Sequence, residues 1–156
     1  MAQIILAPSY ENRSTLPFST NAGAVLQHRC AFAFAVATAL AKDDLIVFGT
    51  LKEGYQPVSV SADSDGIGAG GEDGGLTADI LLVDDLESPK TSIVVAEGLS
   101  FADQSIVSGD LTLEAIRYKG LNQPMYLVAK VTTAVTAPVN SEIAVTFSYR
   151  YRQSTD

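Results

Sequence analysis

The residues most able to do chemistry in this chain are its one histidine and its one cysteine, His28 and Cys30. A thiol nucleophile needs a base within hydrogen-bond reach, and His28 is the only imidazole that the sequence offers. On a β-strand the two side chains would share one face, where such neighbours are seldom aligned for proton transfer. A single cysteine excludes an intramolecular disulfide and a cysteine-based zinc site, and a single histidine excludes a paired-histidine metal site. We therefore predict a structural or interfacial role for His28.

Two pairs of adjacent carboxylates, Asp43-Asp44 and Asp84-Asp85, are the next candidates. Glycosidases place two carboxyl groups across a sugar, usually beside aromatic platforms, but this sequence contains no tryptophan. Adjacent aspartates at strand ends more commonly form turns, and no G-x-S-x-G element is present. We therefore expect no catalytic residues, no cofactor and no enzyme activity.

An acidic, glycine-rich segment at residues 61–75 holds six of the twelve glycines and four carboxylates. Its start, Asp63-Ser64-Asp65-Gly66, suggests a calcium loop, because hard cations bind several carboxylates within a short turn. An EF-hand would need a glutamate at the twelfth loop position, which is Gly74 when counted from Asp63, and flanking helices. A phosphate-binding glycine loop would need a lysine and a following helix. The interpretation that fits best is a flexible, charged loop between two strands.

The elements that must position these residues are mostly strands. In Cys30–Thr38 bulky side chains occupy the even positions and alanines the odd ones, which predicts a strand with one bulky and one flat face. The competing interpretation is a helix over Ala22–Ala41, because alanine has a high helix propensity. The pattern in Glu142–Arg152 is the clearest, since Ile143, Val145, Phe147, Tyr149 and Tyr151 alternate with polar residues. That alternation is typical of an antiparallel sheet with one solvated face.

Further strands are expected at short, turn-separated intervals along the rest of the chain, at Asp44–Leu51, Pro57–Ala62, Leu76–Val83, Thr91–Val95, Leu111–Tyr118 and Tyr126–Val135. Only Ala96–Ile106 has a helical pattern, interrupted by Gly98. Residues 1–26 are rich in turn-forming residues, so we predict an extended N-terminal arm there, with a disordered tail as the alternative. The whole is therefore predicted to be all-β, an antiparallel β-sandwich or barrel domain over residues 27–156 that follows the arm.

Charge is distributed unevenly along the chain, whose formal net charge is −8. Between Asp43 and Glu114, 15 acidic residues face two lysines, whereas residues 1–42 carry +2 and residues 115–156 carry +3. Such an acidic chain is repelled by phosphate backbones, so nucleic acid is not an expected partner. The N-terminus lacks a basic secretory n-region, and the longest apolar stretch, about 12 residues, is too short to span a membrane. We therefore expect a soluble protein without a membrane partner, made in a reducing cytoplasm.

The segment Lys42–Val58, KDDLIVFGTLKEGYQPV, resembles a strand-and-turn motif of the form N/D-D-x-I-x-L/F-G-x-L-P-A-G. This motif is found in the small β-sandwich or jelly-roll decoration (cement) proteins on the heads of tailed bacteriophages. An upstream strand at Arg29–Thr38 and a terminal strand at Ile143–Tyr151 are in comparable order, so the resemblance covers residues 27–152. Lys52-Glu53-Gly54 stands where Pro-Ala-Gly is usual, and the loop 61–75 is longer than in the family.

The resemblance implies a jelly-roll-like sandwich that binds and stabilises the major capsid protein lattice on the virion surface, after synthesis in the bacterial cytoplasm. It also implies a homo-oligomer, a trimer in first place and a dimer in second. The arm could add a strand to a neighbour, and the candidate partner-binding residues are Arg13, Leu16, Phe18 and Arg29. The alternative function is a receptor- or glycan-binding module of a head fibre or tail, for which the six tyrosines would supply the contacts. A calcium-dependent adhesive module is a third possibility, carried by the loop 61–75.

Overall fold

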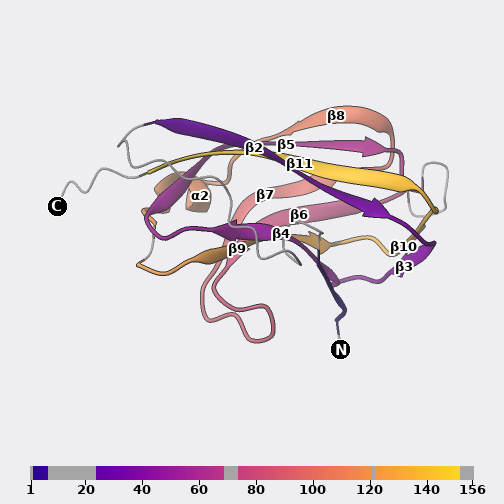
Figure 1. Ribbon diagram of the computed structural model, residues 1–156, viewed down its shortest axis with the longest axis horizontal. Coiled ribbons are helices and arrows are strands. Elements are labelled where there is room, and N and C mark those ends of the chain that lie inside the picture. The colour runs from indigo at the N-terminus through magenta and orange to yellow at the C-terminus, as the bar shows by residue number, and fades with distance from the viewer. Residues whose placement is uncertain (1, 7–23, 69–73, 121, 152–156) are drawn as a thin grey trace.

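The computed structural model describes residues 2–6, 24–68, 74–120 and 122–151. Within these ranges the chain folds into two main β-sheets that face each other, with a short two-stranded ladder at one end (Figure 1). The five-stranded sheet has the order β1 (Ile4–Leu6), β4 (Leu45–Leu51), β9 (Met125–Val131), β6 (Thr77–Val83) and β7 (Ser92–Ser100). The four-stranded sheet has the order β2 (Val25–Phe34), β11 (Ser141–Tyr151), β5 (Tyr55–Asp65) and β8 (Gln104–Gly109). The ladder joins β3 (Thr38–Leu40) to β10 (Val135–Ala137), and α2 (Leu113–Arg117) lies against β7.

The predicted antiparallel β-sandwich is confirmed. Every strand pair in the two main sheets is antiparallel except β1 with β4. Without the three-residue strands β1, β3 and β10, eight strands remain, and they can be numbered 1 to 8 in chain order from β2 to β11. In these numbers the four-stranded sheet has the order 1-8-3-6, and the other sheet has the order 2-7-4-5. Most consecutive strands therefore cross from one sheet to the other, which is the strand order of a jelly roll.

The alternation of large and small residues in β2 determines which face meets the core. Cys30 and Phe34 are buried at 2% and 1% exposure, whereas Val25, Gln27, Arg29 and Ala33 on the odd positions are exposed. The strand interpretation is thus confirmed for residues 25–34 and the helix interpretation is wrong. In β11, Ile143, Val145, Phe147 and Tyr149 are fully buried between the sheets, as the alternation predicts.

Two predicted elements are wrong, and local hydrogen bonds explain both. Leu111–Tyr118 was expected to be a strand, but α2 begins after Thr112, whose hydroxyl accepts a hydrogen bond from the Ala115 amide at 3.1 Å. Ala96–Ile106 was expected to be a helix, but it contains the end of β7 and the start of β8. Gly98 has a φ of +61°. It sits where β7 bulges against β6, and its amide donates to the Asp79 carboxylate at 2.7 Å.

Part of the segment predicted to be an arm pairs with the domain itself. β1 runs parallel to β4 and forms the edge of the five-stranded sheet, and Leu45 N–H donates to the Gln3 carbonyl at 2.8 Å. The Asp44 carboxylate, on a residue only 3% exposed, accepts the amides of Gln3 at 2.7 Å and Ala41 at 2.8 Å. At the other end of the predicted arm, β2 begins at Val25.

The glycine-rich segment is more ordered at its ends than a flexible loop would be. β5 continues through Asp65, and the Ile67 side chain that follows is fully buried. Ile67 N–H donates to the Phe101 carbonyl, Leu76 N–H to the Ile67 carbonyl, and Phe101 N–H to the Leu76 carbonyl, each at 2.8–2.9 Å. The prediction of a flexible loop over residues 61–75 is therefore wrong at both ends, and residues 69–73 lie outside the described ranges.

Candidate interaction surfaces

The thiol is held in the core, away from solvent. Cys30 is 2% exposed, and burial raises the pKa of its thiol to about 12. The thiolate, which is the nucleophilic form, is therefore scarce near neutral pH. In the described part of the chain, no three His, Cys, Asp or Glu side chains group closely enough to hold a metal ion. The same ranges contain no helix long and apolar enough to cross a membrane.

Both aspartate pairs serve turns. Asp43 adopts a φ of +72° and its carboxylate lies 3.0 Å from the Lys130 ammonium. The Asp84 carboxylate accepts the amides of Lys90 at 2.9 Å and Thr91 at 3.0 Å. The hydrogen bond from Thr91 is the main cause that lowers the pKa of Asp84. These carboxylates hold the backbone in place, as expected of turn-forming aspartates.

Arg29 is the one candidate partner-binding residue that the structure describes, since Arg13, Leu16 and Phe18 lie outside the described ranges. It projects from β2 across the outer face of the four-stranded sheet. Its Nε and Nη2 donate to the two Asp63 carboxylate oxygens at 3.0 and 2.6 Å, and Nη2 also donates to Glu142 at 2.7 Å. These hydrogen bonds, first to Asp63 and then to Glu142, raise the pKa of Arg29 further above its usual range. The guanidinium thus links three strands, β2, β11 and β5.

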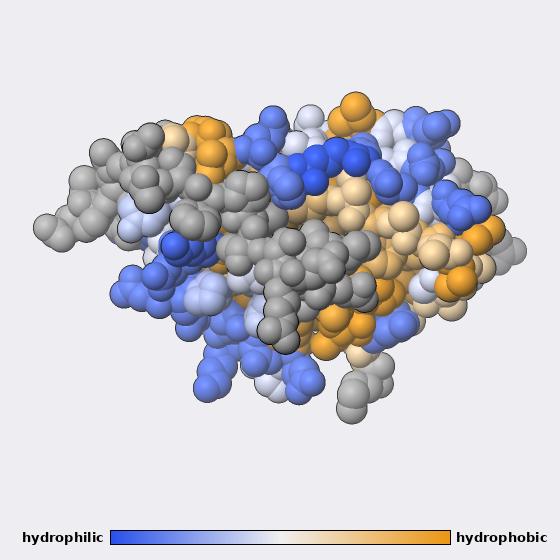
Figure 2. Space-filling model, in the orientation of Figure 1, coloured by the Kyte–Doolittle hydropathy of each residue, from blue (hydrophilic) through white to orange (hydrophobic). Residues whose placement is uncertain are grey.

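Most of this outer face is polar and built from small side chains. An open hollow of about 600 Å³ beside Arg29 is lined mainly by hydroxyl and carboxylate groups, with Ile106 at its border. Ile106, which is 79% exposed, is the large apolar side chain among the residues that line the hollow. Figure 2 shows blue and white atoms predominating along this upper side of the molecule, where β2, β5, β8 and β11 lie in Figure 1. The face offers hydrogen-bonding groups but no aromatic platform among its lining residues.

Replacement of Arg29 by alanine is expected to lower the free energy of unfolding by about 1 kcal/mol, because it leaves two carboxylates without their shared cation. The effect should shrink in high salt, since all three side chains are 27–48% exposed and are screened by ions. Urea unfolding at low and high salt measures the loss of stability and its dependence on salt. Arg29→Lys is the matched control, because lysine keeps the charge but cannot make the bidentate contact. Its free energy of unfolding should lie between those of the wild type and Arg29→Ala. Equal stability of Arg29→Ala and wild type at low salt would contradict the expectation.

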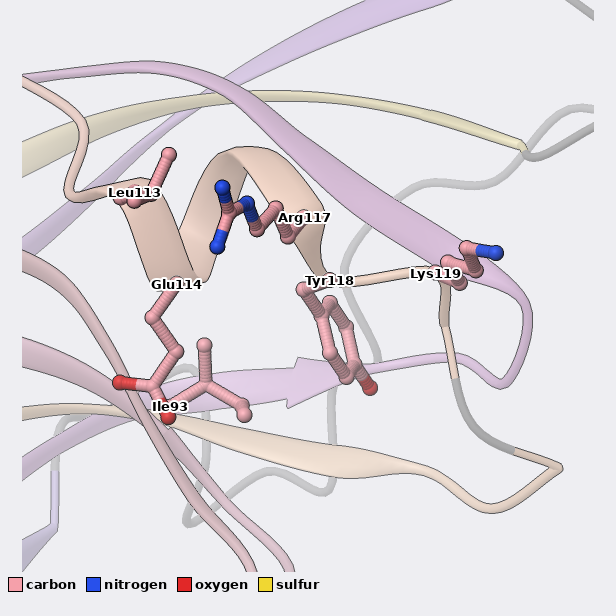
Figure 3. Close-up of a pocket in the computed structure, with 6 residues that line it drawn as sticks. All are labelled: Ile93, Leu113, Glu114, Arg117, Tyr118 and Lys119. Atoms are coloured by element: carbon pink, nitrogen blue, oxygen red, sulfur yellow. The ribbon is translucent and has the colours of Figure 1, made fainter.

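A second surface feature is the groove beside α2, which no sequence pattern had indicated (Figure 3). Thr112 N–H donates to the Val95 carbonyl at 3.0 Å, and the Thr112 hydroxyl donates to the Val94 carbonyl. The Glu114 carboxylate accepts the Val94 amide at 3.2 Å. Residues 112–114 therefore cover part of the edge of β7, which protects this edge from pairing with another strand. The signal that could have revealed α2 is a threonine N-cap followed by a glutamate in the first turn.

The groove itself is open, about 560 Å³, and is lined by Ile93, Leu113, Glu114, Arg117, Tyr118 and Lys119. In Figure 3 the Glu114 carboxylate extends to Ile93 and the Tyr118 ring lies on the other side of Ile93, whereas Lys119 points away from both. Leu113 and Ile116 are 58% and 62% exposed on the short helix. The groove can offer apolar contact and positive charge, but its lining contains no nucleophile paired with a base.

The tyrosines that a glycan-binding module would need are mostly used inside the sandwich. Tyr55, Tyr118 and Tyr149 are 8% exposed or less, and the rings of Tyr55 and Tyr149 meet edge to face at 5.5 Å. Among the described tyrosines, Tyr151 is the most exposed, at 42%. Core packing, rather than ligand contact, explains their placement.

Comparison with known proteins gives likenesses of structure only. No known family and no curated protein matches the chain. A chain of the solved structure "Capsid of Ralstonia phage GP4" matches with a TM-score of 0.78 and 22% identity, covering 97% of this chain and 99% of that one. The chain shares its fold with a protein of a phage capsid. A chain of "Cyanophage Pam1 capsid asymmetric unit" matches with a TM-score of 0.51 and 15% identity, over 92% of this chain and 96% of that one. At these identities the likeness shows the fold and leaves the function to be argued.

Proposed function

We propose that this chain is a non-catalytic structural protein of a phage virion, a decoration protein that binds the major capsid protein lattice of the head and stabilises it. The observation that carries the proposal is the end-to-end likeness to a phage capsid chain, which covers 97% of this chain and 99% of that one. The second capsid likeness, to the cyanophage chain, points the same way.

The chemistry of the described residues supports a passive role. The single thiol is buried with a raised pKa, and the acidic pairs hold turns rather than a substrate. A β-sandwich whose strands β2, β5 and β11 are linked by Arg29 presents a broad sheet face, which suits contact with a lattice. Many equivalent copies on one lattice give avidity, so each contact need only be modest. The protein would act by bridging neighbouring capsid subunits, which raises the force or heat needed to separate them.

The purified chain is expected to sediment with empty heads of the phage that encodes it and to saturate at a fixed ratio to the major capsid protein. A sucrose gradient followed by gel densitometry measures both. Bound heads should also resist heat better than bare heads, because a ligand that binds only the assembled lattice stabilises it. The heat-unfolded chain is the matched control, because it has the same composition and charge but no folded surface. Failure to bind heads at any ratio, with reproducible hits on a glycan array, would favour the receptor-binding alternative instead.

A further inference from the structure

One end of the molecule is apolar although it is built from connecting loops. The β2–β3 connection supplies Ala35, Val36 and Ala37, and the β10–β11 connection supplies Pro138 and Val139. All five residues are exposed, Val36 at 68% and Val139 at 55%. We call these five residues the apolar end. In Figure 2 orange and pale-orange atoms gather at the right-hand end of the molecule, where β3 and β10 are labelled in Figure 1.

The two connections are fixed side by side. Phe34 pairs with Ser141 where β2 meets β11, and Thr38 pairs with Ala137 in the β3–β10 ladder, so both loops are closed at each end. Asn140 N–H donates to the Phe34 carbonyl at 2.7 Å, and the Ser141 hydroxyl donates to the Pro138 carbonyl at 2.6 Å. Val36 and Val139 are therefore presented by held turns, so ordering them on contact costs little entropy.

The apolar end lies in an uncharged part of an acidic chain. Residues 30–41 and 131–141 contain no Asp, Glu, Lys or Arg, although the formal net charge of the chain is −8. Two copies that approach through acidic faces repel each other, whereas contact through this end brings together two segments that carry no charged side chain. Small apolar side chains are also complementary to themselves, as a closed symmetric contact requires. These features select a second copy of the same chain as the occupant.

We infer that copies of this chain associate through the apolar end, with Val36 and Val139 at the centre of the contact. Five small residues bury less than the roughly 800 Å² per partner of a standard stable interface. The association is therefore weak in free solution, with a dissociation constant on the order of 100 μM. It strengthens where another surface holds the copies close together.

Sedimentation velocity of the full chain, from about 10 to about 500 μM, tests the inference. The weight-average sedimentation coefficient of the wild type should rise with concentration. Val36→Asp/Val139→Asp should stay at the monomer value, which corresponds to at least about tenfold weaker association. The matched control is Val25→Asp/Ile106→Asp, which adds the same two charges at apolar residues of the four-stranded sheet that are 56% and 79% exposed. The control should associate like the wild type, and urea unfolding verifies that both variants are folded.

Three results would overturn the inference. The wild type could remain monomeric throughout the range, or the two double variants could associate equally. The Val36→Asp/Val139→Asp protein could also lose binding to phage heads while the wild type is monomeric, in which case the apolar end faces the capsid. Self-association without any binding to heads would instead refute the proposed function and leave this inference standing.

Discussion

Phe147→Ala is expected to lower the free energy of unfolding by about 4 kcal/mol, a large fraction of the 5–15 kcal/mol typical of a domain. Phe147 is fully buried in β11, the strand that pairs with both β2 and β5. Its ring stacks on Tyr149 with centroids 5.5 Å apart. Truncation removes that contact and leaves a cavity between two sheets whose backbones are fixed by ladders on either side, so little can move in to fill it.

Urea unfolding followed by circular dichroism measures the loss. Ile106→Ala is the matched control in the same sheet, because it also truncates a large apolar side chain, but one that is 79% exposed. We expect it to change the free energy of unfolding by less than about 0.5 kcal/mol. Similar losses for the two variants would mean that the buried face of β11 does not hold the sandwich together.

Strands with a strict alternation could be predicted from the sequence alone. In β2 and β11 the large apolar side chains at every second position point to the core, and a period of two predicts them directly, although Ala144 and Ser148 on the other face of β11 are buried as well. The motif at Lys42–Val58 falls on β4, the following turn and the start of β5, so the resemblance located two real strands, which lie in different sheets. These elements required no knowledge of distant partners.

The wrong predictions concern segments whose structure depends on contacts with residues distant in the sequence. Residues 112–114 leave the strand pattern because they bond to the edge of β7 at Val94 and Val95. β8 pairs with β5, about forty residues earlier, and its own burial pattern is weak because much of it is exposed. Gly98 weakened the helix prediction for 96–106, and its positive φ belongs to a β-bulge.

The candidate surfaces were predictable only in part. Arg29 could be named from charge, but its partners are 34 and 113 residues away, so only the strand register brings them together. The apolar end joins two loops that are separated by most of the chain. An apolar loop looks unremarkable in a sequence with 47% apolar residues, and it becomes informative only when a second one lies beside it.

The last expected result concerns the two glycines that close the glycine-rich segment. Gly74 and Gly75 both have positive φ, at +76° and +86°. A Cβ on Gly74 would meet nothing within 4 Å, whereas one on Gly75 would lie 2.5 Å from the Ala102 Cβ and 2.9 Å from the Ile67 carbonyl oxygen. Alanine is strained at either position because both have a left-handed backbone conformation, and only Gly75→Ala adds a steric clash.

We expect Gly74→Ala to lower the free energy of unfolding by about 1 kcal/mol and Gly75→Ala by about 3 kcal/mol. The clash falls on the backbone bonds that join Ile67, Leu76 and Phe101, all fully buried, so the chain cannot relax without breaking them. The two variants add the same methyl group in the same backbone region, so the difference between their urea midpoints isolates the clash. Equal losses of unfolding free energy in the two variants would mean that the backbone shifts at Gly75 to make room for the methyl group, as a flexible loop does. A difference of about 2 kcal/mol would mean that this end of the segment is packed inside the core.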